Sequence, residues 1–133
     1  MDYKAEEGFV RSFIVKNRRE RVLYELTTPK KRYDGISRFC HEAVELLDPA
    51  RIAMEGEDLE LRPEFRAFVR KHDEICLVLS LEYYPENLLM SFEDAVELAV
   101  MSMDAVLILG DGFAVVFGEP YVAGRGKYLM TDK

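Results

Sequence analysis

The sequence predicts an α/β fold, with α+β as the alternative, in which an N-terminal helical hairpin packs on a small mixed sheet of about four strands that ends in a β-hairpin. Three observations predict it. Apolar residues recur at helical spacing through the first third of the chain, residues 75–81 form a nearly continuous apolar run, and two further apolar runs flank residues 110–112.

The N-terminal helices come first. Over residues 8–26, apolar side chains recur three or four apart with basic residues between them, which predicts one amphipathic helix. Thr28 and Pro29 have the order of an N-cap and a first helical residue, and the helical spacing then continues to a stop before Pro49. Because the link is short, the two helices are expected to form an antiparallel hairpin.

The middle of the chain supplies short elements. A strand is expected over residues 51–54 and a turn at Gly56, and Pro63 starts a third helix. Residues 75–81 have the pattern of a strand covered on both faces, which we place at the centre of the sheet. Ser91 and Asp94 have capping-box spacing and predict a helix from residue 92 to about residue 103.

A β-hairpin closes the sheet. Its strands are residues 105–109 and 113–117, and Asp111 with Gly112 fits a type I′ turn. We expect one domain over residues 1–133, with residues 1–7 and 120–133 loosely ordered.

The outer edge of strand 113–117 needs a cover, because it is apolar and contains neither Lys nor Pro. The segment from Tyr121 to Met130 can fold back over it, or a second copy of the chain can pair there as a symmetric homodimer. Gly124 and Gly126 make that segment a poor strand, which favours the dimer.

Composition describes an ordinary globular protein, because the 133 residues are 49% hydrophobic and 32% charged. No apolar run approaches the ~18 residues of a membrane span, and the first residues lack a basic region followed by an apolar stretch. We therefore expect a cytoplasmic protein without membrane contact. Cys40 and Cys76 fall in a helix and a strand and are expected to be reduced core thiols, with a disulfide as the alternative.

The charge is unevenly distributed. Residues 1–38 have a net charge of +4 and the remaining residues one of −11, within a total of −7. Either this asymmetry marks an interaction surface, or the two parts attract each other inside one fold.

Catalytic chemistry has few candidates. Cys40 and His41 are adjacent on a helix, so their side chains diverge, and His72 is explained as a cation at a helix C-terminus. The histidines and cysteines have no zinc-site spacing, and the glycines form no nucleotide-binding loop. No cofactor, metal or catalytic residue is therefore predicted, and a non-enzymatic protein is favoured over an enzyme.

Two groups of residues are candidate binding sites. The first follows strand 75–81, because ligands gather at the carboxyl ends of parallel strands, although an ordinary loop with its rings packed on the sheet edge is the favoured explanation. It comprises Glu82, Tyr83, Tyr84, Glu86 and Asn87. The second is a basic surface on the N-terminal helices that would contact phosphate groups. It comprises Arg18, Arg19, Arg21, Lys30, Lys31 and Arg32.

Five segments resemble, in their order along the chain, small bacterial proteins with no assigned function. The resemblance implies a compact bacterial domain and supplies no activity or functional residue. The segments are residues 16–26, 30–47, 75–80, 91–100 and 112–119.

The leading hypothesis is a non-enzymatic interaction or regulatory protein that binds a protein partner. One alternative is a nucleic-acid-associated protein that uses the basic helices, against which stand the net charge of −7 and the lack of interleaved aromatic residues. The other is a small hydrolase or nuclease that holds a divalent ion with Glu82, Glu86 and Asp111.

Overall fold

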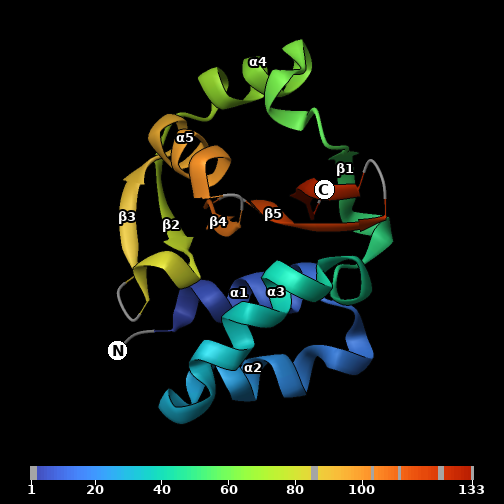
Figure 1. Cartoon of the computed structure of the whole chain (residues 1–133), viewed down its shortest axis with the longest axis vertical. Coiled ribbons are helices and arrows are strands. Elements are labelled where there is room, and N and C mark those ends of the chain that lie inside the picture. The colour runs from blue at the N-terminus through green and yellow to red at the C-terminus, as the bar shows by residue number, and fades with distance from the viewer. Residues whose placement is uncertain (1–2, 85–86, 103, 111, 123–124, 133) are drawn as a thin grey trace.

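The computed structural model describes residues 3–84, 87–102, 104–110, 112–122 and 125–132, and at positions 40, 44, 83, 119–122 and 125 it describes the backbone alone. An antiparallel sheet lies between two layers of helices (Figure 1). The mixed helix-and-strand fold with N-terminal helices packed on a sheet is confirmed, although the sheet has six strands rather than about four.

The strand order is β1-β6-β5-β4-β2-β3, and every neighbouring pair is antiparallel. The prediction of a mixed sheet centred on residues 75–81 is therefore wrong, because β2 lies next to the edge strand β3. The chain turns back after β2 and pairs at once, whereas a parallel neighbour would need a crossover helix. The strands are β1 (Ile52–Glu55), β2 (Ile75–Leu79), β3 (Leu88–Ser91), β4 (Ala105–Ile108), β5 (Phe113–Val122) and β6 (Arg125–Thr131).

The predicted loose C-terminal tail is also wrong, because residues 125–131 form β6. This strand pairs with β5 on one side and with β1 on the other, and Tyr128, Leu129 and Met130 are buried. Burial of three large side chains outweighs the poor strand propensity of Gly126. The outer edge of β5 is thus covered by the chain itself, and the reason for expecting a homodimer at that edge falls away.

The N-terminal region contains two helices where one was predicted over residues 8–26. These are α1 (Lys4–Phe13) and α2 (Arg19–Thr27), so residues 4–7, expected to be loose, are helical. Between them Ile14 is extended and bridges Leu47, while the Val15 N–H donates to the Leu46 carbonyl over 2.8 Å. The six polar residues 16–21 leave a long helix without an apolar stripe at that point.

The remaining helices follow the predicted pattern. They are α3 (Arg32–Leu46), α4 (Pro63–Lys71) and α5 (Phe92–Ser102). The strand expected over residues 51–54 corresponds to β1 and the predicted hairpin to β4 and β5. In that hairpin the Leu109 N–H donates to the Phe113 carbonyl and Gly112 has a φ of +81°, while Asp111 lies outside the described residues.

Each face of the sheet carries its own core. Helices α1 and α3 cover one face, with α2 packed on the outer side of both, and α4 and α5 cover the other (Figure 1). Because strand side chains alternate, Val106 and Ile108 of β4 pack toward the first layer while Ala105 and Leu107 pack toward the second. Within the described residues, no helix has the length and apolar content that crossing a membrane requires.

Candidate functional site

The loop after β2 was predicted as a binding site, and its premise fails because β2 has no parallel neighbour. Two of its five residues form side-chain contacts with the rest of the fold. Tyr84 is half-buried with its ring edge-on to that of Tyr33, at a centroid distance of 5.4 Å, and the Asn87 side-chain oxygen accepts a hydrogen bond from Arg32 over 2.8 Å. Glu82 is exposed, only the backbone of Tyr83 is described, and Glu86 lies outside the described residues.

Arg32 does not belong to a basic surface, because its side chain is buried. Its guanidinium forms a two-pronged ion pair with the buried Glu6 at 2.5 and 3.1 Å and donates to the Leu26 carbonyl over 2.8 Å. It also lies over the ring of Tyr3. Only Nε has no hydrogen-bond partner. Arg32 thus joins α1, the end of α2 and the loop before β3.

The other predicted basic residues do not form one patch. Arg18, Arg19 and Arg21 lie at the start of α2, whereas Lys30 and Lys31 follow its end, about 15 Å further along at the helical rise per residue. Arg19 is half-buried and donates from Nε to the Ile14 carbonyl over 2.8 Å. The remaining four are exposed. This arrangement gives a nucleic acid backbone two separate contacts rather than one continuous basic face.

Cys76 and His72 were explained from the sequence as a core thiol and a residue at a helix C-terminus. Burial, and secondarily the charge of Glu74, raises the pKa of the Cys76 thiol to about 12, so the thiol is protonated and unreactive near neutral pH. His72 follows the C-terminus of α4, and its ring packs between those of Phe68 and Phe113. Among the described residues, no three His, Cys, Asp or Glu side chains are grouped so as to hold a metal ion.

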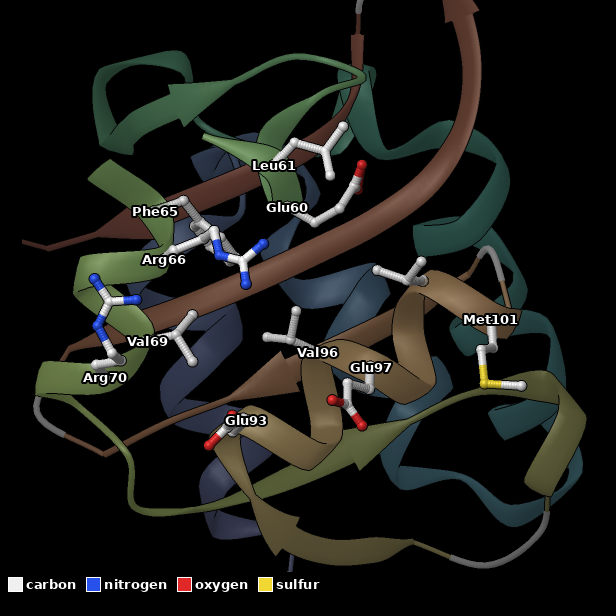
Figure 2. Close-up of a pocket in the computed structure, with 11 residues that line it drawn as sticks. Glu60, Leu61, Phe65, Arg66, Val69, Arg70, Glu93, Val96, Glu97 and Met101 are labelled. Carbon is white, nitrogen blue, oxygen red and sulfur yellow. The ribbon is translucent and has the colours of Figure 1, made fainter. Parts of the chain in front are cut away.

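A cleft opens between α4 and α5 on the second face of the molecule. Its volume is about 460 Å³ (Figure 2). Ring contacts of Phe65 and Phe68 with Phe92 join the two helices at the start of α5, and the helices diverge from there. The cleft is lined by Glu60, Leu61, Phe65, Arg66, Val69, Arg70, Glu93, Val96, Glu97, Val100 and Met101.

The cleft has an apolar interior and charged rims. Leu61, Val100 and Met101 are 67%, 41% and 85% exposed, so apolar surface is open to solvent at its wide end. Arg66 and Arg70 stand on the α4 side, and Glu93 and Glu97 stand on the α5 side (Figure 2). At the end formed by the turn before α4, Glu60 is held by Lys127 of β6.

None of these residues was predicted as a site, although the sequence contains a signal for them. On α5, Ala95 and Ala99 are buried and Leu98 is half-buried, so these three side chains face the core. Val96 and Val100 form a second apolar pair one turn apart on the same helix. An apolar stripe wider than one packing face indicates that a helix has a second surface to cover.

A second hollow of about 440 Å³ lies between α1 and the edge of the sheet formed by the start of β2, by β3 and by the end of β4. Its apolar lining includes Ile75 and Leu89, which are 64% and 71% exposed. Gly8 of α1 also lines it. Asp132 is the one charged side chain among its described lining residues, so this hollow offers a ligand little to recognise besides shape.

Comparisons of the chain with family models, with curated proteins and with solved structures found no match.

Proposed function

We propose that this chain is a non-enzymatic interaction protein that binds a partner protein in the cleft between α4 and α5. The observation that carries the proposal is the combination of an apolar interior with charged rims, the composition of protein contact surfaces. Leu61 and Met101 add large exposed apolar side chains at the wide end, and exposed apolar surface is typical of sites where proteins bind partners.

The chemistry of the lining suits contact with another protein. Its described residues are apolar, Arg or Glu, so an apolar surface is flanked by groups that can pair with charges of either sign. The rim arginines suit binding, because a guanidinium pairs with carboxylates in a fixed fork geometry.

Site-specific crosslinking tests the proposal. A photoreactive benzophenone amino acid at Met101 is expected to capture a discrete protein from a lysate of the native host. The same group at Tyr24, 59% exposed on α2, is the matched control and should not capture it. Val100→Glu, which places a charge in the apolar lining, should abolish the adduct at position 101 in a chain that melts like the wild type.

Two outcomes would refute the proposal. One is the absence of any discrete adduct at position 101 when the chain is produced and crosslinked inside its host. The other is the same adduct from positions 24 and 101, which would locate the contact elsewhere.

A further inference from the structure

The four charged side chains on the rims of the cleft are free to bind a partner. Arg66 and Arg70 are exposed and one turn apart on α4, and Glu93 and Glu97 are exposed and one turn apart on α5. Within the described part of the chain, none of these side chains forms an ion pair or a hydrogen bond. By contrast, Arg62 beside them pairs with Asp58 at 3.1 Å and donates to the Glu55 carbonyl.

The two rims have opposite charge, and this determines which charges a bound segment must have on its two flanks. A segment lying along the cleft has one flank beside two guanidinium groups and the other flank beside two carboxylates (Figure 2). Electrostatic complementarity therefore requires acidic residues on the flank that faces α4 and basic residues on the flank that faces α5.

The backbone of that segment must satisfy its own hydrogen bonds. The described lining comes from helices α4 and α5 and from the helical turn Leu59–Leu61, so no strand edge is present to pair with an extended peptide. A helix is the conformation whose N–H and C=O groups are paired internally, and it can enter an apolar cleft without leaving them unsatisfied.

On the first side of the sheet, α1 and α3 lie against the strands and α2 packs on them (Figure 1). On the second side, α4 and α5 diverge from their contact at Phe92, and the cleft between them leaves Val100 41% exposed. A helix laid between them would place its apolar stripe on Val96 and Val100.

We propose that the cleft binds an amphipathic helix of a partner protein, with an acidic flank against Arg66 and Arg70 and a basic flank against Glu93 and Glu97. This inference rests on the proposed function and adds the chemistry of the partner. Each rim spans one turn between its charges, so a helix of about 12 residues, roughly 18 Å long, is sufficient.

Selection from a displayed library of random 16-residue peptides tests the chemistry. The wild-type chain is the target, and binders to Val100→Glu are removed. Enriched peptides are expected to have apolar residues at i, i+3, i+4 and i+7, acidic residues on one flank and basic residues on the other. They should be helical in the bound state by isotope-edited NMR.

Charge reversal then assigns each flank. For an enriched peptide, Arg66→Glu with Arg70→Glu is expected to raise the Kd about tenfold, and Glu93→Lys with Glu97→Lys to do the same. Reversing the matching flank of the peptide should restore the affinity. Arg18→Glu with Arg21→Glu, at the start of α2, is the matched control and should change the Kd less than about twofold.

The outcomes separate this inference from the proposed function. The inference would be overturned by peptides that require the cleft but bind in extended form, or by peptides whose Kd is unchanged by both charge reversals. In either case the crosslink at Met101 would still support a partner protein. A selection that yields no cleft-dependent peptide would also overturn the inference. A loss of binding with Arg18→Glu and Arg21→Glu alone would place the contact on α2.

Discussion

Arg32 and Glu6 illustrate how one residue pair connects distant segments of this chain. The carboxylate and the guanidinium are both buried, and the same guanidinium binds the Leu26 carbonyl and Asn87. Removing one member of a buried ion pair leaves a charge without a partner, which costs more than the pair itself contributes.

We therefore expect Glu6→Gln to lower the free energy of unfolding by about 3 kcal/mol, measured by urea denaturation. The double variant Glu6→Leu with Arg32→Met should lose less than Glu6→Gln, because no buried charge remains. If Glu6→Gln cost less than ~1 kcal/mol, the ion pair would not be buried in solution as it is in the structure.

Cys76 should make stability depend on alkaline pH. Its pKa is raised to about 12 by burial, whereas an unfolded chain ionises the thiol near its ordinary value of 9.0. Above pH 9 the unfolded chain therefore releases a proton that the folded chain retains. The thiol's stabilising contribution is complete below pH 9 and is lost as the pH rises toward 12, by up to ~1.4 kcal/mol per pH unit.

The measurement compares the wild type with Cys76→Ala between pH 8 and pH 11. The cavity left by Ala is independent of pH, so the wild-type advantage should shrink above pH 9. A constant advantage across this range would mean that the thiol is accessible to water. In Cys40→Ser, iodoacetamide should label the folded chain at pH 8 only at the rate of unfolding.

At the scale of an element, replacing glycine by alanine is expected to change the free energy of unfolding in opposite directions at two positions. Gly8 lies inside α1 and an added Cβ would meet no atom within 4 Å, whereas Gly112 has a φ of +81° in the β4–β5 hairpin. At Gly112 an added Cβ would lie 2.1 Å from a carboxylate oxygen of Asp132.

Gly8→Ala is expected to raise the free energy of unfolding by about 0.5–1 kcal/mol, since Ala has the higher helix propensity. Gly112→Ala should lower it by about 1–2 kcal/mol, because Ala is strained at positive φ and displaces Asp132. Urea denaturation of both variants checks the signs. If Gly8→Ala lowered the free energy of unfolding instead, the open space beside Gly8 in the second hollow would contribute to the stability of the isolated protein.

Strand β6 is expected to be essential for the stability of the fold, although its sequence has a low strand propensity. Met130 is fully buried in β6 and Met101 is 85% exposed in α5, which makes them a matched pair. Met130→Asp is expected to cost more than about 4 kcal/mol or to prevent folding, because it buries an unpaired charge. Met101→Asp should change the melting temperature by less than ~2 °C. Equal effects at both positions would contradict the placement of β6.

At the scale of the whole molecule, the order of the strands makes the two ends of the chain depend on each other. β6 lies between β5 and β1, so the C-terminal segment joins the hairpin to the strand that follows the N-terminal helices. Removing it would expose two strand edges and both core faces at once.

A chain that ends at Glu119 is therefore expected to aggregate, whereas the full chain stays in solution under the same conditions. Light scattering together with circular dichroism checks this. A truncated chain that remained monomeric with the melting temperature of the full chain would show that β6 is dispensable. Homodimer formation remains a prediction from the sequence, and the strands left at the edges for it are β1 and β3.

The sequence by itself determined the local elements of this protein. The helical spacing of residues 36–47, the apolar run 75–79 and the two strands around Gly112 predicted α3, β2 and the β4–β5 hairpin, because each pattern reflects contacts within one element. It also indicated the helix α4 through Pro63, whose fixed φ suits a first helical turn.

Only the tertiary structure decided which segments meet. β3 and β6 are weak strands in isolation and exist because neighbours supply their hydrogen bonds and bury their side chains. From the sequence, Arg32 was expected on the surface, whereas in the structure it is buried and forms an ion pair with Glu6, which is distant in the sequence. The cleft was not predictable for the same reason: its shape depends on the angle at which α4 and α5 diverge, and long-range packing sets that angle.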